Sequence, residues 1–331
     1  MALVSCLFCC LDGDDGAVFC RFFRFPVLWM DGLKRMGMTF GRLVFALGLS
    51  AGFMAIGFPV VSCAAPVSVS ALQMTEGESR AWDLYRAGKY DDALAVFRAL
   101  QGNGDVSALY GLGVMATNGF GMARDDARAL RWFREGAEKG SREAQFGLGA
   151  MYDLGRGVRK DNTQALDWYR KSAKAGYAPA MTRLGRMNLL GRGMSRDYGQ
   201  AFYWLKKAAA AGDVNGQYYF GMMFIRGWGT RRDVRLAENW IRKAAASGQP
   251  LAMRVLSRLY EGGYGVPQSD REALKWLKKS ADAGDREALK RLSAVYENGM
   301  FGVKPDRETA LALKKKTALV KKPVFPDYAV M

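Results

Sequence analysis

The sequence contains no histidine, and all of its cysteines lie near one end. Histidine is the commonest general base and metal ligand in proteins, so its absence excludes every nucleophile–histidine pair. The five cysteines are Cys6, Cys9, Cys10, Cys20 and Cys63. Residues 64–331 therefore have neither disulfides nor thiolate metal sites. We predict a protein that is not an enzyme and that has no metal and no cofactor.

Proline is also scarce. Between residues 67 and 322 it occurs only at Pro179, Pro250, Pro267 and Pro305. Proline breaks a helix anywhere beyond its first turn. None of these four falls inside a helix predicted below, except in a first turn, so the sequence leaves room for many uninterrupted helices.

Acidic residues are too few to balance the basic ones. The chain has 49 Lys and Arg against 32 Asp and Glu, which gives a formal net charge of +17. Residues 1–65 hold five of the basic and four of the acidic residues, so the rest retains 44 minus 28, or +16. This charge favours acidic protein surfaces, anionic glycans, membrane surfaces or nucleic acid as partners. The alternative is a basic surface that is only solvated.

Residues 36–65 have the pattern of an export signal. The segment 43–61 is almost entirely apolar, follows the basic Arg42, and precedes small residues of the kind that a signal peptidase accepts. Cleavage after Ala64 or Ala65 would deliver the chain to the periplasm or to the outside of the cell.

Two alternatives to cleavage stay open. The segment from Val60 to Cys63 resembles a bacterial lipobox, in which Cys63 would be lipidated and would anchor the chain to a membrane. The apolar run is also long enough for an uncleaved membrane anchor, although Pro59 lies inside it. Because an export signal belongs at the start of a chain, we interpret residues 1–35 as an incorrectly assigned start, with Met36 or Met38 as the true one, or as a disordered extension.

Tryptophan recurs with a fixed spacing of 36 residues, at Trp132, Trp168, Trp204, Trp240 and Trp276. A glycine follows each of them eight residues later, and a Gly-x-Gly pair, such as Gly155 and Gly157, precedes each of them. A fixed period of about 20–50 residues is typical of a solenoid, in which each unit contacts its neighbours.

We predict six repeat units with a different unit before them. The six units span residues 105–140, 141–176, 177–212, 213–248, 249–284 and 285–320. Residues 66–104 form a linker and a helix–turn–helix cap of tetratricopeptide type. Leu313 replaces the tryptophan in the sixth unit, where no further unit follows to pack against it. Residues 321–331 form a basic tail.

The unit at residues 141–176 illustrates the design. One face of a first helix carries Ala144, Leu148, Met151 and Tyr152. Asp161 starts a second helix as its N-cap, with Gln164 completing a capping box, and Gly176 ends that helix. We predict that the tryptophan of the second helix fills the space between one unit and the next.

This unit closely resembles the Sel1-like repeat. The matching residues are Ala144, Leu148, Gly149, Tyr152, Gly155, Gly157, Asp161, Ala165, Trp168, Tyr169, Ala173 and Gly176. The resemblance recurs six times over residues 105–320. It implies an all-α fold, namely a right-handed α/α superhelical solenoid of helix–turn–helix repeats related to tetratricopeptide repeats. It also implies an exported bacterial adaptor that binds other proteins.

The candidates for partner binding are the positions that vary while the framework repeats. In solenoids of this kind the first helices line the concave side, where we predict exposed positions that include Gly111, Gly147 and Arg183, with Tyr110 and Phe146 beside them. The predicted partner-binding residues are Arg183, Arg186, Tyr218, Tyr219, Arg254, Arg258, Lys290 and Arg291. Arg and Tyr are frequent at binding hot spots. We expect an acidic, partly apolar protein segment as the partner, and the alternative is an ordinary solvated helix face.

The sequence thus predicts a non-catalytic adaptor that mediates protein–protein interactions in the bacterial envelope. The alternative is a factor that binds or assembles an envelope glycan, such as peptidoglycan or an acidic exopolysaccharide. The export signal and the absence of a known aromatic–basic motif argue against nucleic acid. One cysteine-rich branch of the family has been credited with β-lactamase activity, and the lack of cysteine in the repeats argues against transferring that activity to this chain.

Overall fold

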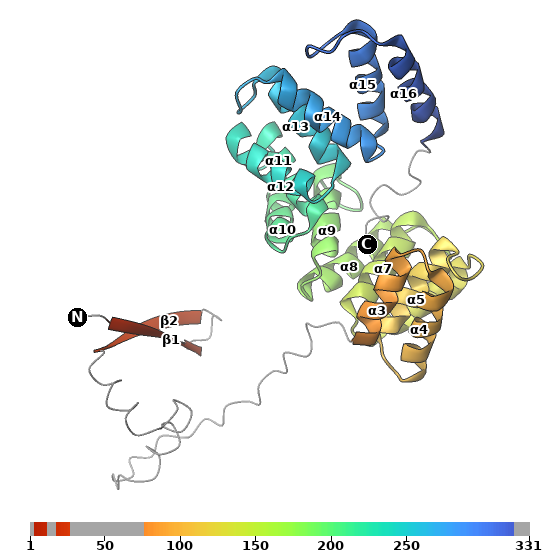
Figure 1. Cartoon of the computed structure of the whole chain (residues 1–331). Coiled ribbons are helices and arrows are strands. Elements are labelled where there is room, and N and C mark those ends of the chain that lie inside the picture. The colour runs from red at the N-terminus through yellow and green to blue at the C-terminus, as the bar shows by residue number, and fades with distance from the viewer. Residues whose placement is uncertain (1–2, 12–17, 27–75, 321–331) are drawn as a thin grey trace, which may run out of the picture. The chain divides into compact units, whose positions relative to one another are not determined.

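The computed structural model describes residues 3–11, 18–26 and 76–320, which divide between two compact units (Figure 1). In the first unit, strands β1 (Leu3–Leu11) and β2 (Val18–Pro26) pair antiparallel, with Leu3 opposite Pro26. The sequence analysis predicted no strands in this segment. The predicted export signal at 36–65, the lipidation candidate Cys63 and the basic tail at 321–331 lie outside the described residues.

The described part of the second unit consists of helices only. A first pair, α3 (Glu76–Arg86) and α4 (Tyr90–Gly102), precedes the repeats. The first helices of the six following pairs, called inner helices below, are α5 (Ser107–Asn118), α7 (Arg142–Leu154), α9 (Ala178–Leu190), α11 (Val214–Arg226), α13 (Pro250–Gly262) and α15 (Arg286–Asn298). The second helices, called outer helices, are α6 (Asp126–Glu138), α8 (Asn162–Lys174), α10 (Tyr198–Ala210), α12 (Val234–Ala246), α14 (Asp270–Asp282) and α16 (Arg307–Leu319). The predicted all-α repeat fold is confirmed for this unit.

The helix ends follow from residues that the sequence repeats. Gly155 caps the end of α7 with a φ of 68°, a left-handed conformation that glycine adopts without strain. The Asp161 side chain then accepts hydrogen bonds from the backbone N–H groups of Thr163 and Gln164 at the start of α8. Gly176, just past that helix, has a φ of 86°. Both predicted helix ends are therefore confirmed.

The second glycine of each Gly-x-Gly loop joins neighbouring units. A Cβ atom on Gly157 would lie 2.5 Å from the carbonyl oxygen of Asp126, the first residue of α6 in the preceding unit. Gly229 has the same relation to Tyr198 in the unit before it, also at 2.5 Å. Only glycine permits so close an approach of two backbones. The loop glycines thus both end a helix and connect consecutive units.

The centre of each helix pair is filled by the residue that follows the tryptophan. The fully or almost fully buried residues at this position are Phe133, Tyr169, Leu205, Ile241 and Leu277. A Cβ atom on Gly149 of α7 would lie 2.8 Å from the Tyr169 ring, so glycine on the inner helix makes room for this side chain. We predicted that the tryptophan fills the space between one unit and the next. Trp276 is buried, at 7% exposure, whereas Trp168 and its equivalents in three other units are only partly buried.

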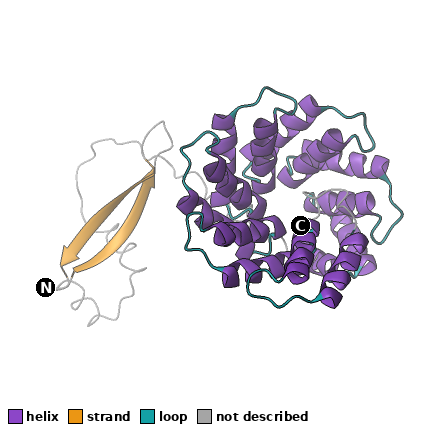
Figure 2. Ribbon diagram, turned by 90° about the horizontal axis from the view of Figure 1, so that it is seen from above, coloured by secondary structure: helices purple, strands orange, loops and turns teal. Residues whose placement is uncertain are grey.

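The helix pairs wind into two layers around a common axis (Figure 2). Inner helix α5 lies against α7, and α9 against α11. Among the described residues, no two outer helices contact each other to a comparable extent. Because neighbouring elements crowd together on the inside of a curve, the inner helices line the concave face. None of the helices within residues 76–320 is both long and apolar enough to cross a membrane.

Candidate functional site

The concave face is closed in the first three repeat units. Gly111 and Gly147 were predicted to be exposed, but a Cβ atom on them would lie 2.3 Å from the Phe97 ring and 2.6 Å from the Phe133 ring. Arg183, predicted to contact a partner, is only 8% exposed. Tyr110 and Phe146, which we also expected on this face, are 3% exposed each. The prediction of an open face was wrong for these positions.

The physical reason lies in the residue 14 positions earlier on the preceding outer helix. Phe97, Phe133 and Tyr169 are large enough to reach between two inner helices. In the later units the same position holds shorter side chains, Leu205, Ile241 and Leu277, and the facing residues are Tyr219, Val255 and Arg291. Short aliphatic side chains leave space above them, so the concave face opens towards the C-terminal units.

A tyrosine pair adds to the closure of the N-terminal half. The side chains of Tyr110 on α5 and Tyr177 at the start of α9 share a hydrogen bond across the intervening unit. Burial raises the pKa of both hydroxyls above the ordinary value of tyrosine, and the hydrogen bond from Tyr110 partly offsets this rise at Tyr177. Both therefore stay neutral at physiological pH and act as structural contacts.

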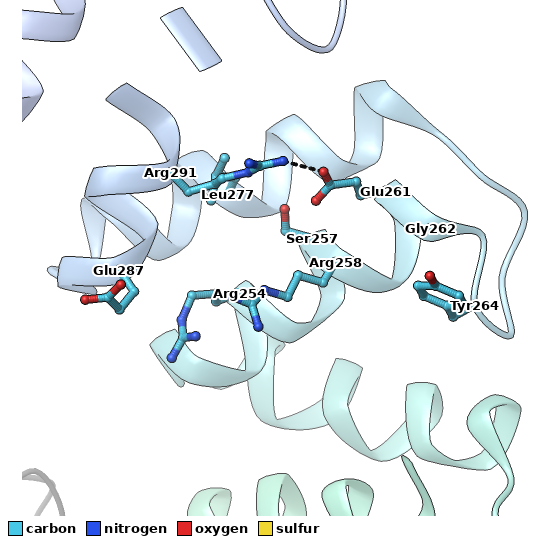
Figure 3. A pocket seen from close by; sticks show the side chains of 9 residues that line it. All are labelled: Arg254, Ser257, Arg258, Glu261, Gly262, Tyr264, Leu277, Glu287 and Arg291. Atoms are coloured by element: carbon cyan, nitrogen blue, oxygen red, sulfur yellow. Dashed lines mark hydrogen bonds and ion pairs between the residues drawn. The ribbon is translucent and has the colours of Figure 1, made fainter. Parts of the chain in front are cut away.

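A cavity of about 490 Å³ opens between α13 and α15, where the closure ends (Figure 3). We call it the α13–α15 slot. Its lining residues are Arg254, Ser257, Arg258, Glu261, Gly262, Tyr264, Leu277, Glu287 and Arg291. Leu277, on outer helix α14, is 2% exposed and forms part of the floor. Leu277 thus stands at the slot in the position that a large aromatic residue, Phe133 or Tyr169, holds in the N-terminal units.

The three arginines of the slot differ in whether a carboxylate already pairs with them. Arg254 Nε lies 2.8 Å from Oδ2 of the buried Asp285. Arg291 Nη2 lies 2.5 Å from Glu261 Oε1, which bridges the two inner helices (Figure 3). Arg258 is exposed and has no ion-pair partner within residues 76–320. Arg258 is therefore the guanidinium that an incoming carboxylate can bind without displacing another.

Glu287 forms an ion pair with Lys290 on the same helix, α15. A hydrogen bond from Lys290 Nζ, 2.8 Å from Glu287 Oε1, lowers the pKa of this carboxyl below its usual value. With three arginines against Glu261 and Glu287, both of them paired, the slot offers positive charge to a ligand.

An exposed aromatic ring stands at one end of the slot. Tyr264, in the loop after α13, is 59% exposed. The corresponding loop residues of two other units stack on the preceding unit. Phe120 stacks on Tyr90 with ring centroids 4.3 Å apart, and Trp228 stacks on Tyr198 at 6.1 Å. The residue that would partner Tyr264 is Val234, which has no ring, so Tyr264 remains available to a ligand.

Three more predicted residues continue the polar surface along the concave face. The guanidinium of Arg186 on α9 lies 5.0 Å from the Tyr219 ring centroid on α11. The rings of Tyr218 and Tyr219 are also 5.0 Å apart. Burial raises the pKa of Tyr218, and the nearby charge of Arg254 opposes that rise. These contacts connect α9, α11 and α13.

The predicted binding residues thus separate into four groups. Arg254, Arg258 and Arg291 line the slot, and Arg186, Tyr218 and Tyr219 lie on the inner helices α9 and α11. Lys290 lines a different, smaller hollow between α15 and α16. Arg183 is buried. The sequence analysis missed Glu261, Tyr264, Leu277 and Glu287; the size of residue 277 relative to residue 133 was the available signal.

The polar groups of the slot are suited to binding. The hydroxyl Oγ of Ser257, on α13, donates a hydrogen bond to the Ala273 carbonyl oxygen at 2.8 Å. Ser257 stands at the position where earlier units have a packing glycine, such as Gly149. Within the described part of the chain, no group of three or more Cys, Asp or Glu side chains is placed to hold a metal ion. The remaining polar groups are three guanidinium cations, a phenol and the paired carboxylates of Glu261 and Glu287. Guanidinium groups and phenols recognise carboxylates and apolar surface.

Comparisons with known proteins agree with this fold. A family model described as Sel1 repeat matches residues 106–141, 142–177, 178–213, 214–249, 250–285 and 286–318. A Sel1 repeat protein from Oxalobacter formigenes is 28% identical, with a TM-score of 0.64 over 74% of this chain and 97% of that chain. The protein c5321, a protective antigen of uropathogenic Escherichia coli displaying an SLR fold, is 32% identical, with a TM-score of 0.56 over 73% of this chain and 53% of that chain. No curated protein matches the chain.

Proposed function

Because the chain belongs to the Sel1 repeat family, we propose that it is an adaptor of the bacterial envelope that holds an acidic protein segment on its concave face. Sel1 repeat solenoids are typical protein–protein interaction scaffolds and are generally not catalytic. The export signal predicted from the sequence of residues 36–65 supports the envelope location.

The observation that carries the proposal is the α13–α15 slot. The concave face is closed by side chains up to α9 and opens where residue 277 is a leucine. The opening presents the unpaired Arg258 and the exposed Tyr264 at the same place. Arginine and tyrosine often supply most of the binding energy at interfaces, because they combine charge or a hydroxyl with a large contact area. A segment with a carboxylate and an apolar neighbour fits this pair.

Selection from a random peptide library tests the proposal, because it needs no identified partner. The full chain is immobilised and the peptides that it retains are sequenced. We expect selected peptides to combine Asp or Glu with an aromatic or aliphatic residue. The variant R258E/Y264A should lose them by on the order of 10²-fold, since two hot-spot residues are removed. Reversal of Arg254 is avoided, because it would leave the buried Asp285 without its partner.

The control is the variant R131E/Y203A, which changes an exposed arginine and an exposed tyrosine on outer helices α6 and α10. It has the same change of charge and loses one ring, so it should bind the selected peptides like the wild type. Equal losses in both variants, or selected peptides without acidic residues, would contradict the proposal.

A further inference from the structure

The outer helices carry a second repeating pattern that the proposed adaptor site does not use. The two residues that lie two and three positions after each tryptophan are basic in almost every unit. They are Arg134 and Glu135, Arg170 and Lys171, Lys206 and Lys207, Arg242 and Lys243, and Lys278 and Lys279, with Lys315 and Lys316 after Leu313. Glu135 alone departs from the pattern. Basic residues at one phase of successive units form a continuous row.

Four lysines of this row lie near the tryptophan of their own helix, and one of them, Lys207, lies nearer still to Tyr203, at 4.6 Å. Lys171 Nζ lies 3.9 Å from the Trp168 ring centroid, Lys207 5.9 Å from Trp204, Lys243 4.4 Å from Trp240, and Lys279 4.9 Å from Trp276. All four are exposed. Within residues 76–320 none of them forms an ion pair, although acidic residues are present on three of the four helices. We call these residues the outer lysine row.

The distribution of charge separates the two faces. In the five units from α7 to α16, the outer helices contain 16 basic and 6 acidic residues, a net charge of +10. The inner helices of the same units contain 9 basic and 5 acidic residues, a net charge of +4. Most of the positive charge of these helices is therefore on the convex face, away from the α13–α15 slot.

From these observations we propose that the outer lysine row binds a flexible acidic polysaccharide along the convex face. Each lysine is a compact, mobile point charge that accepts carboxylates of varied geometry. The row advances by one unit at a time, and the helices that carry it wind around a common axis (Figure 2). A flexible polyanion can follow such a path and engage several lysines at once, and the linked contacts raise its affinity.

The geometry favours this ligand over other polyanions. A membrane surface is flat on the scale of this protein. It can therefore contact only part of a row of lysines that curves around the axis of the helices. Duplex DNA has a persistence length of about 50 nm and does not bend to the curvature of one small protein without cost. Single strands bind mainly by stacking bases on open aromatic rings. Here the four tryptophan rings beside the row are partly or fully buried, and Tyr203, 46% exposed, is one open ring with Lys207 4.6 Å from its centroid.

Titration with polygalacturonate, a polymer of uronic acid, tests the proposal on the full chain. The tryptophans beneath the lysines provide the fluorescence signal, and neutral dextran is the negative control. The variant K171Q/K207Q/K243Q/K279Q should bind the polymer on the order of 10²–10³-fold more weakly at low ionic strength. The slope of log affinity against log salt should become shallower by about 3, since four counterion-releasing contacts are lost.

A second variant separates the row from net charge alone. K139Q/K275Q/K290Q/K314Q removes the same charge from lysines that already pair with Glu135, Glu272, Glu287 and Glu297. It should keep the affinity of the wild type within about threefold. The double variant K207Q/K243Q should fall between wild type and the fourfold variant, which keeps the test valid if the latter unfolds.

Three results would overturn the proposal. The wild type could fail to bind polygalacturonate, or the two fourfold variants could lose affinity equally. Anionic vesicles or single-stranded DNA could also bind as tightly and depend equally on the row, which would assign it to another class of partner. The adaptor proposal is tested independently, because R258E/Y264A should leave polymer binding unchanged.

Discussion

The most informative perturbation closes the α13–α15 slot with residues that close the same space elsewhere in the chain. In the earlier units, Gly113, Phe133 and Gly147 pack together, and a Cβ atom on Gly113 would lie 2.3 Å from the Phe133 ring. The equivalent positions at the slot hold Ser257, Leu277 and Arg291. The triple variant S257G/L277F/R291G transfers the closed arrangement to the slot.

The expected change in stability is small, because gains and losses oppose each other. Two glycines in helices cost about 1 kcal/mol each, and the lost hydrogen bond from Ser257 to Ala273 costs about 1 kcal/mol. Loss of the Arg291–Glu261 pair, at the surface, costs about 0–1 kcal/mol. Burial of the phenylalanine returns about 1–2 kcal/mol. The net destabilisation of about 1–3 kcal/mol leaves the unit folded.

Binding should respond much more strongly than stability. The double variant S257G/R291G keeps Leu277 and therefore an open slot, so it isolates the loss of Arg291. Isothermal titration with a selected acidic peptide should show a further loss of at least about tenfold on going from the double to the triple variant, since the ring excludes the ligand. Circular dichroism verifies that both variants are helical. Equal affinities of the two variants for the peptide would refute the argument that residue 277 decides where the face is open.

Two other predictions concern the scaffold. Gly149→Ala should lower the free energy of unfolding by about 1 kcal/mol, because overpacking against the Tyr169 ring, 2.8 Å from the added Cβ atom, outweighs the gain in helix propensity. Urea denaturation measures this change, and a variant more stable than the wild type would contradict the prediction. Burial, followed by the charge of Glu143, raises the pKa of Glu78 above its ordinary value of 4.5 in the folded state. The protonated Glu78 side chain therefore contributes most to the folding stability below pH 4.5, and this contribution is lost as the pH rises through the pKa of the folded state. Glu78→Gln should remove this decline and be more stable than wild type at pH 7, as followed by thermal melts across pH; parallel profiles would exclude the effect.

The helices could be predicted from the sequence because their ends depend on nearby residues. Asp161 caps α8 through the two N–H groups that follow it, and Gly155 ends α7 by its own conformation. A period of 36 residues then placed every later helix by repetition. Local chemistry was sufficient for this part of the fold.

The exposure of the concave face depends on a neighbour in another unit and was therefore harder to predict. Gly147 and Arg291 occupy equivalent positions, but one packs under Phe133 and the other lies above Leu277. The sequence contains both partners 14 residues apart, yet their contact follows only from how one unit sits on the next. The same holds for Arg183, whose charge suggested a surface position although it is buried.

A photo-crosslinking amino acid at two tyrosine positions tests the central claim, which is that a protein segment binds beside the α13–α15 slot. Tyr264 at the slot is 59% exposed, and Tyr203 on outer helix α10, 46% exposed, is the matched control. After irradiation in cells, mass spectrometry identifies the attached peptides. The account predicts adducts with acidic protein segments at position 264 and none of them at position 203. The same segments at both positions, or adducts only at position 203, would contradict it.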